Sequence, residues 1–200
     1  MIDAHPSRQK LIDAAIALVR ERGYADTKVD EICARAGIGK GSFFHHFKTK
    51  EDVLLASIDH WNSFTGEAFR TAPYRDLSDP LDRLLGYVEF RIAMLDMPIS
   101  DFSCLLGTLV QEVYSSHPKL LAACDAGMSG HIDELVADVA AAKALYAPDA
   151  PFSAESLGYF IQAALQGSFI QAKARHGSGV ARDNLAHVSR YLETIFPRSN

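Results

Sequence analysis

The sequence predicts an all-helical protein, and two observations carry this prediction. Apolar residues recur at spacings of three and four along almost the whole chain, as they do on one face of an α-helix. Alternation between apolar and polar side chains, which a half-buried strand would show, is confined to a few short runs. Of the 200 residues, 48% are hydrophobic and 22% are charged. This balance is typical of a chain that buries a core, and it excludes an intrinsically disordered protein.

The first two expected helices are bounded by glycines. Residues 7–22 form the first helix, which ends at Gly23 because a left-handed C-cap favours glycine. Thr27 is expected to cap the second helix, with Asp30 as its partner in a shortened capping box. Gly37 ends this helix after about two turns.

Capping signals also predict the remaining helices. A third helix covers residues 39–46, and Thr49 with Asp52 makes a capping box that opens a long fourth helix. A break follows at residues 67–80, where Pro80 stands at the first position of the next helix, after capping side chains. The helices expected beyond it cover residues 81–97, 103–116, 118–146, 153–175 and 180–196.

The overall charge is acidic. A net charge of -5 and an isoelectric point near 5.9 provide no global attraction to nucleic acid or membrane, so a site for a polyanion must be local. Cys33, Cys104 and Cys124 are odd in number and widely separated, which disfavours a disulfide framework and a thiolate zinc site. Residues 1–10 lack the apolar core of a secretory signal, and the longest uncharged run, at 156–172, is too short and polar to span a membrane. A cytoplasmic protein without a membrane partner is expected.

One segment carries a local excess of positive charge. Between residues 27 and 47 the order is short helix, glycine turn, short helix, which is the layout of a helix-turn-helix. Residues 35–50 contain no acidic side chain and two histidines. Their four basic residues are Arg35, Lys40, Lys48 and Lys50. Since the second helix of such a motif enters the DNA major groove, this stretch is a candidate nucleic-acid site.

The residues from 12 to 55, including VDEICARAGIGKGSFFHHFKTKEDVL at 29–54, resemble the N-terminal domain of the TetR family of transcriptional regulators. The resemblance covers about a quarter of the chain and is specific in order and spacing. It implies a DNA-binding head at residues 1–50 and a ligand-binding, dimerising body at residues 51–200. It also implies a homodimer, a palindromic operator in double-stranded DNA, and a repressor that a small-molecule inducer releases from DNA.

The resemblance also implies roles for single residues. The positions that it assigns to DNA contact are Thr27, Lys28, Lys40, Gly41, Ser42, Phe44, His45, His46 and Lys50. Two residues depart from the family pattern. Phe44 replaces the usual tyrosine, so only packing against the sugar remains there. Asp30 stands where a basic residue is common, and a capping role is the expectation for it instead of a phosphate contact.

The last two expected helices carry apolar stripes. From the pattern alone such stripes form a core more often than an interface. The resemblance implies the interface, because dimers of the family pair their last two long helices into a four-helix bundle. The residues expected at this interface are Leu157, Ile161, Ala164, Leu165, Ser168, Leu185, Val188 and Leu192.

The resemblance implies a ligand pocket among the middle helices, and the aromatic and methionine side chains there suit a largely apolar inducer. The residues expected to line it are Trp61, Phe64, Phe90, Met94, Cys104, Leu106, Tyr114, Met128 and Ile132. Each of them taken singly is also typical of an ordinary core. Cys104 lies near the start of an expected helix, where the helix dipole favours a reactive thiolate, although a buried, inert thiol is the alternative.

Other chemistry finds little support in the sequence. His45 and His46 point about 100° apart on a helix and lack a third ligand, so no metal site is expected. The glycines around Lys40 lack the register of a phosphate-binding loop, and no catalytic motif or cofactor motif is present. We therefore expect no enzyme and no cofactor. The alternative function is a helical protein that binds small molecules or senses oxidants and electrophiles through a thiol, with weak or lost DNA binding.

Overall fold

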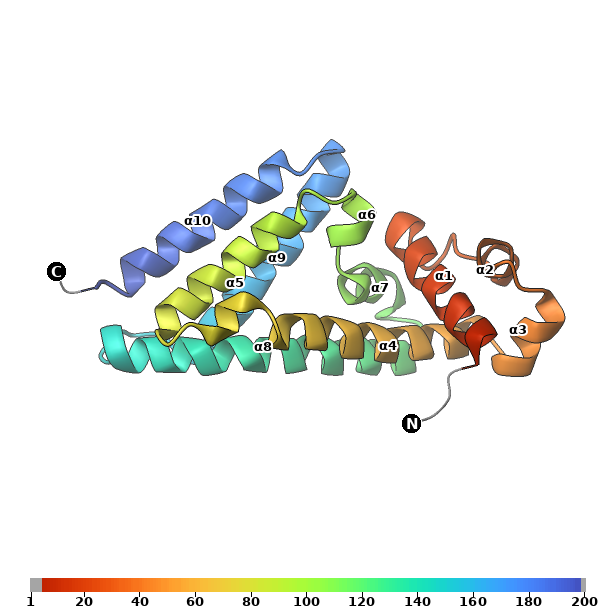
Figure 1. Ribbon diagram of the computed structural model, residues 1–200, viewed down its shortest axis with the longest axis horizontal. Coiled ribbons are helices and arrows are strands. Elements are labelled where there is room, and N and C mark those ends of the chain that lie inside the picture. The colour runs from red at the N-terminus through yellow and green to blue at the C-terminus, as the bar shows by residue number, and fades with distance from the viewer. Residues whose placement is uncertain (1–4, 199–200) are drawn as a thin grey trace. The chain divides into compact units, whose positions relative to one another are not determined.

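The computed structural model describes residues 5–198, and every regular element in this range is helical, with no strand (Figure 1). The prediction of an all-helical chain is therefore confirmed. None of the helices described over this range combines the length and the apolar character needed to cross a membrane.

The chain divides into two compact units. Unit 1 comprises Met1–Gly66 and Ser103–Met128, and unit 2 comprises Glu67–Phe102 and Ser129–Asn200. Two long helices, α4 (Lys50–Arg70) and α8 (Pro118–Tyr146), contribute residues to both units. Each unit has its own apolar core.

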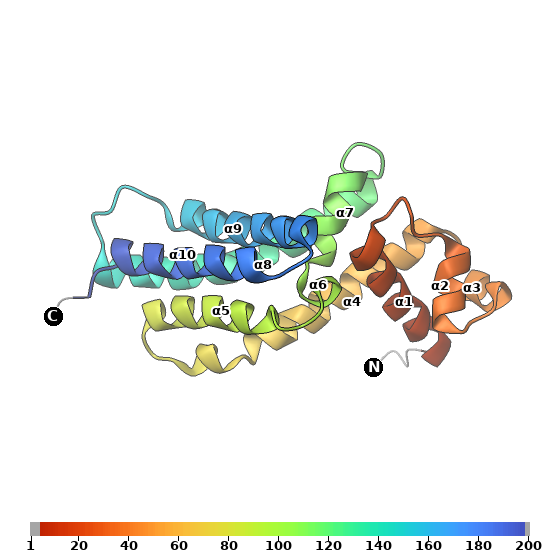
Figure 2. The ribbon, with the colours of Figure 1, turned by 90° about the horizontal axis from the view of Figure 1, so that it is seen from above.

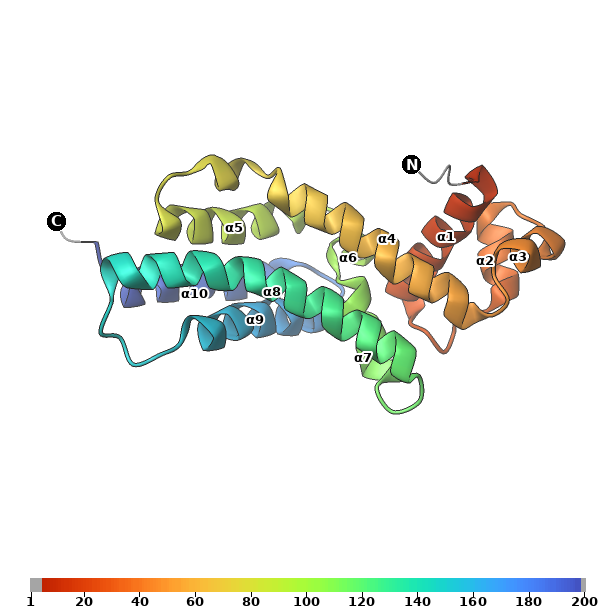
Figure 3. The same cartoon turned by 90° about the horizontal axis from the view of Figure 1, so that it is seen from below.

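Unit 1 groups its N-terminal helices beside the start of α4 (Figure 3). Its other helices are α1 (Pro6–Arg22), α2 (Val29–Ala36), α3 (Lys40–His46) and α7 (Leu105–Val113). The fully buried Leu11, Ile32, Phe43 and Leu54 come from α1, α2, α3 and α4 and belong to one apolar cluster. Burying a side chain of this size contributes about 1.5–3 kcal/mol. The short helices α2 and α3 therefore depend on this shared core for their stability.

Several capping predictions for unit 1 are confirmed. Gly37 follows α2 in the left-handed conformation, with a φ of 65° and a ψ of 31°. Gly23 ends α1 as expected, but its φ of 90° and ψ of 177° are not those of a left-handed C-cap. The Asp52 amide donates to Thr49 Oγ1 at 3.1 Å, and the Thr49 amide donates to Asp52 Oδ2 at 2.9 Å. This reciprocal pair is the capping box expected at the start of α4.

The cap predicted for α2 is wrong. The N-cap is Lys28, whose amide donates to Glu31 Oε2 at 3.0 Å, so Glu31 accepts the hydrogen bond that Asp30 was expected to accept. Thr27 is buried one position earlier, and its hydroxyl donates to Gly23 O at 2.7 Å. The hydroxyl therefore stabilises the turn between α1 and α2 and not the first turn of α2.

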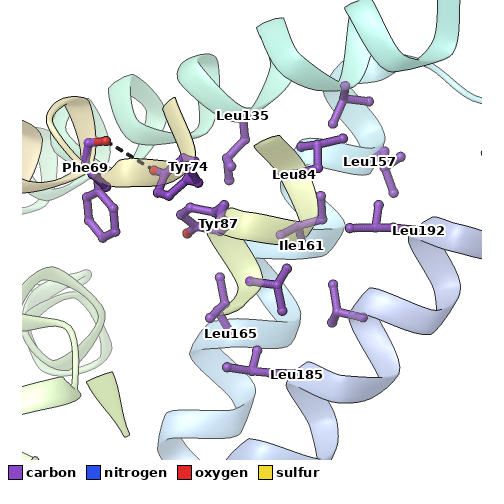
Figure 4. Close-up of a cluster of buried hydrophobic side chains, with 14 of the residues drawn as sticks. Phe69, Tyr74, Leu84, Tyr87, Leu135, Leu157, Ile161, Leu165, Leu185 and Leu192 are labelled. Atoms are coloured by element: carbon purple, nitrogen blue, oxygen red, sulfur yellow. Dashed lines mark hydrogen bonds between the residues drawn. The ribbon is translucent and has the colours of Figure 1, made fainter. Parts of the chain in front are cut away.

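Unit 2 is a helical bundle in which α10 packs on α9 and on α5 (Figure 2). Its other elements are the 3-10 helix η1 (Pro73–Asp76), α5 (Pro80–Met94), α6 (Ile99–Phe102), α9 (Ala154–Arg175) and α10 (Gly179–Ile195). Leu84, Tyr87, Ile161 and Leu185 meet in its core (Figure 4). Gly158 permits a close approach of α9 to α8, because a Cβ there would lie 2.8 Å from Val136 Cγ2.

Most predicted helix bounds in unit 2 agree with the structure to within a residue or two, and the Asp79 carboxylate caps α5 as its position before Pro80 suggests. The helix expected at 81–97 ends earlier, at Met94, because the Leu95 amide donates to Ile92 O in a tighter turn. The helix expected at 103–116 is shorter in the structure, because α7 begins after Cys104, whose backbone is extended, and ends at Val113, while the short α6 precedes it.

Candidate nucleic-acid interface

Helix α3 is anchored by one face and exposed on the other. Phe43 is completely buried, and Phe47, which directly follows the helix, is 5% exposed. The opposite face carries Lys40, Gly41 and His45, all exposed. Phe44 is 56% exposed, and Ser42 and His46 are partly buried. The groove-facing positions expected from the sequence thus share one accessible helix surface.

The cation at the start of α3 is paired within the chain. Lys40 Nζ lies 2.8 Å from Asp30 Oδ1, and both side chains are exposed. The hydrogen bond to this carboxylate and its charge raise the pKa of Lys40, so the lysine stays charged. Arg35 likewise donates to Glu21 at 3.0 Å. A phosphate that meets these cations has to compete with an exposed carboxylate.

Lys50 has a structural role that sequence reasoning missed. Its ammonium donates to Tyr24 O at 2.9 Å and to Thr27 O at 3.0 Å, and it lies 3.7 Å from the centre of the Tyr24 ring. Burial lowers the pKa of Lys50. Both Lys50 and Thr27, expected at DNA phosphates, therefore use their side chains to hold the connection between α1 and α2.

His46 is tied to the N-terminal end of α1. Its Nε2 lies 2.6 Å from Ser7 Oγ, and its ring centre lies 5.2 Å from that of His5. Burial, followed by the nearby His45, His5 and Arg8, lowers the pKa of His46. His46 is therefore uncharged at neutral pH, and a contact with DNA through it would be a hydrogen bond of a neutral ring.

Helix α7 fixes the turn that precedes α2. The Glu112 carboxylate accepts hydrogen bonds from the amides of Tyr24 at 2.9 Å and Ala25 at 2.8 Å. His117 Nε2 lies 2.8 Å from the Tyr24 hydroxyl. Nothing in the sequence pattern indicates these contacts, because Glu112 and Tyr24 are 88 positions apart and both lie on exposed or partly buried surface.

The residues expected to line a ligand pocket are divided between the units. Unit 1 contains Trp61, Phe64, Cys104, Leu106, Tyr114 and Met128, and unit 2 contains Phe90, Met94 and Ile132. Leu106 and Ile132 lie in the apolar cores, at 3% exposure, whereas Phe64 and Tyr114 are 65% and 66% exposed. Cys104 begins α7 as expected, and its Sγ accepts a hydrogen bond from the Gly107 amide at 3.4 Å.

The apolar stripes of α9 and α10 face the core of unit 2. Seven of the eight residues predicted at the interface are at most 4% exposed within the single chain: Leu157, Ile161, Leu165, Ser168, Leu185, Val188 and Leu192. Side chains that are already buried cannot add contact area to a partner. Ala164, Ser168 and Val188 also line a groove formed by these two helices.

This groove, of about 430 Å³, is lined by aromatic, small and polar residues of both helices. They include Phe160, Ala164, Gly167, Asn184, His187 and Tyr191. Phe160 and Tyr191 are 46% and 43% exposed, and their ring centres are 5.3 Å apart. Tyr159 and Ile170, also on α9, are each 49% exposed. Apolar surface that gathers in this way is typical of an interaction site.

Comparison with known proteins agrees with the helix-turn-helix. Residues 11–57 match the family model described as bacterial regulatory proteins, tetR family. The chain is 35% identical over 113 residues to the transcriptional regulator AcuR of Cereibacter sphaeroides, over 56% of this chain and 51% of that protein. It is 40% identical over 83 residues to the regulator BetI of Serratia proteamaculans, over 40% of this chain and 41% of that protein. The chain thus spans about half, or less, of the length of these relatives.

Solved structures agree over a longer range. The crystal structure of the regulatory protein TetR from Rhodobacter sphaeroides superimposes with a TM-score of 0.82 and 26% identity, covering 96% of this chain and 100% of that one. The matched N-terminal segment contains α2 and α3 with the glycine turn between them, and the remaining helices follow the same plan as that structure. Residues 11–57 thus resemble the tetR family of bacterial regulatory proteins, and the whole chain shares the fold of a solved regulatory protein TetR.

Proposed function

We propose that this protein is a transcriptional regulator that binds double-stranded operator DNA through α3. The observation that carries the proposal is the division of α3 into an anchored and an accessible face, with Phe43 buried and Lys40 and His45 exposed. A helix held in this way can enter a major groove without losing its packing. Residues 1–50 are the DNA-binding head in this proposal, and residues 51–200 are the regulatory body.

The contacts with DNA divide into two kinds. Lys40 and Lys28 supply charge for phosphates, while Ser42 and His45 provide hydrogen-bonding groups that can reach base edges from the exposed surface of α3. Phe44, exposed and without a hydroxyl, supplies an apolar contact to sugar or to a thymine methyl. Phosphate contacts position the helix, and base contacts select the sequence.

The protein acts as a homodimer in this proposal, paired through the outer faces of α9 and α10. The exposed Phe160, Ile170 and Tyr191 support this assignment, since an interface needs apolar surface that the single chain leaves uncovered. A two-fold symmetric dimer presents two copies of α3 to half-sites about 34 Å apart, which explains a palindromic operator.

In this proposal the protein is a repressor, and a small-molecule inducer that binds the regulatory body releases it from DNA. A ligand that binds better to the conformation with weak DNA affinity shifts the population toward it, and the coupling free energy acts equally in the opposite direction. Typical couplings of about 1–3 kcal/mol change DNA affinity by about 5-fold to 150-fold.

Fluorescence anisotropy with DNA fragments from upstream of the protein's own gene tests the proposal. We expect one fragment to bind at least a thousandfold more tightly than a random duplex at the same salt concentration, as specific regulators do. Weaker binding of that fragment by Lys40→Ala, with an unchanged circular dichroism spectrum, would place the contact on α3. Equal affinity of the wild-type protein for all fragments would contradict it.

A further inference from the structure

Unit 2 contains three buried polar atoms without a hydrogen-bond partner among the residues that the structure describes. They are Arg91 Nε on α5 and Gln162 Oε1 and Gln166 Nε2 on α9. A buried polar group without a partner destabilises a fold by about 1–3 kcal/mol, and native proteins contain few of them. A bound polar molecule that reaches these three atoms would supply the missing partners.

The Arg91 guanidinium lies between two aromatic rings. Its Cζ is 5.2 Å from the ring centre of Phe69 and 5.2 Å from that of Phe169. Within residues 5–198, Arg91 takes part in none of the ion pairs. The other partly buried arginines of the unit are neutralised, since Arg75 and Arg83 contact Asp138 at 2.9 and 2.7 Å. The unit thus leaves the charge of Arg91 uncompensated.

The groups around Arg91 keep this region positive. The ring of His131 lies 4.6 Å from that of Phe69, and its Nε2 is 2.9 Å from the Tyr87 hydroxyl (Figure 4 shows Phe69 and Tyr87). Burial, followed by the charges of Arg91 and Arg75, lowers the pKa of His131 to about 4. The imidazole is therefore neutral at pH 7, and none of these neighbours supplies a negative charge.

The two glutamines lie on the same side of α9 as one of the rings. Positions 162, 166 and 169 are separated by four and three residues, so Gln162, Gln166 and Phe169 follow one helix face. Gln162 is 8% exposed and Phe169 is 3% exposed, which places this face in the interior. Arg91 reaches the same face from α5 through its contact with Phe169.

We propose that Arg91, Gln162 and Gln166 recognise a small organic acid, with its carboxylate on Arg91 and Gln166. A guanidinium binds a planar carboxylate with two donors, and Gln166 Nε2 adds a third donor. Gln162 Oε1 accepts a hydrogen from a hydroxyl group next to the carboxylate. The rings of Phe69, Phe90 and Phe169 pack against the apolar part. This inference rests on the proposed function, because it names the chemical class of the inducer.

Calorimetry and thermal unfolding of the full-length protein test this site. The ligands are straight-chain carboxylates from acetate to octanoate, each with and without a hydroxyl next to the carboxylate, and their primary amides. Sodium chloride and sodium sulfate at equal ionic strength serve as inorganic anions. We expect one or more carboxylates to bind and raise the melting temperature, with at least tenfold weaker binding of the matching amide. Equal effects of amides or of inorganic anions, or no binding by any carboxylate, would overturn the proposal.

Variants locate the site. Arg91→Gln should weaken carboxylate binding at least tenfold and, because Arg91 has no ion pair to lose, should remain folded. Gln166→Leu is a second test that leaves the charge in place, and it should weaken binding as well. The control is Arg182→Gln, which breaks the ion pair with Asp96 on the surface of the same unit. Unchanged binding in both Arg91→Gln and Gln166→Leu would refute the assignment.

A parallel DNA-binding measurement separates this inference from the proposed function. If the function is correct, the carboxylate releases the wild-type protein from DNA but leaves Arg91→Gln bound. If no DNA sequence is preferred, the function fails while carboxylate binding at Arg91 still stands. If DNA is bound specifically but no carboxylate binds, the inference fails and the function stands.

Discussion

Lys40 at the start of α3 forms an ion pair with Asp30 on α2, with 2.8 Å between Nζ and Oδ1. Both side chains are exposed, so the pair contributes little to the stability of the fold. The ion pair instead affects the binding of DNA, because the Asp30 carboxylate partly neutralises the Lys40 ammonium on the surface that we propose to contact DNA. The ion pair therefore acts as a competitor of the phosphate.

Replacing Asp30 should strengthen binding to DNA. In Asp30→Asn the lysine is released and a repulsion with phosphate is removed, so we expect affinity to rise about 3-fold to 10-fold at low salt. Anisotropy titrations across a salt series measure this. Asp149→Asn, in the loop between α8 and α9, changes the net charge equally and serves as the control. Equal gains in both variants would show that only total charge matters.

Replacing Lys40 should have the opposite effect. Lys40→Ala should weaken binding at every salt concentration and reduce the salt slope by about one unit for each phosphate that a head no longer neutralises. Together with Asp30→Asn it forms a double-mutant cycle. If Asp30 acts through Lys40, Asp30→Asn should change the affinity for DNA much less in the Lys40→Ala background than in the wild-type protein. Full additivity of the two changes would contradict a direct coupling between the two side chains.

The connection between α1 and α2 should be sensitive to Glu112 and Gly23. Glu112→Ala leaves the amides of Tyr24 and Ala25 without their acceptor, and we expect a loss of about 1 kcal/mol in unfolding free energy. Gly23→Ala should cost more, because Gly23 has a φ of 90° and a Cβ there would lie 2.1 Å from Glu112 Oε1. Urea denaturation followed by circular dichroism measures both.

A glycine elsewhere provides the matched control. Gly130 lies inside α8, and a Cβ there would meet nothing within 4 Å. Gly130→Ala should therefore stabilise the protein by up to about 1 kcal/mol through helix propensity. A similar loss of stability in Gly130→Ala and Gly23→Ala would show that the proximity of Gly23 to Glu112 has no special role.

Stability should fall as the pH is lowered below neutrality, and His131 should account for much of the change. Its pKa is about 4 in the folded protein, against about 6.5 in an unfolded chain, so the unfolded state binds more protons between these values. Unfolding free energy therefore rises with pH over this window, by about 3 kcal/mol at most. His46, whose pKa is also lowered, contributes in the same direction.

Replacing the ring isolates the contribution of His131. Denaturation midpoints of His131→Gln at pH 4.5 and pH 7 should differ less than those of the wild-type protein. His176→Asn, at an exposed position directly after α9 where the backbone is left-handed, should retain the wild-type pH dependence. A pH dependence in His131→Gln as steep as in the wild-type protein would assign the effect to other groups.

Local signals in the sequence predicted the helices well. Gly37, Asp52 and Asp79 act through neighbours within a few positions, so their patterns specify the caps directly. Contacts across the chain could not be predicted in this way. The charge run at 35–50 contains Lys50, but only the fold shows that its ammonium turns inward to Tyr24 O and Thr27 O.

The same limit applies to the apolar stripes on α9. Periodicity identified the stripe through Ile161 and Leu165 correctly as one helix face, but it cannot say whether a face meets its own chain or a partner. A second stripe through Phe160, Ala164 and Gly167 lies beside it, and small residues there obscure the pattern. Only burial in the folded chain distinguishes the two stripes.

The exposed stripe should control the oligomeric state. Phe160→Asp or Tyr191→Asp places a charge on the apolar surface of α9 or α10, and we expect the dimer to dissociate at micromolar concentration because an unpaired charge would have to be buried. Light scattering during gel filtration gives the mass directly. Leu145→Asp, at a position 61% exposed near the end of α8, introduces the same charge outside the groove and should leave the dimer intact. A monomeric wild-type protein would contradict the proposed dimer, and a dimer that survives both groove variants would place its interface on another surface. If the groove variants are monomeric and folded, they should also lose most of their affinity for a palindromic operator, since each head then binds only one half-site.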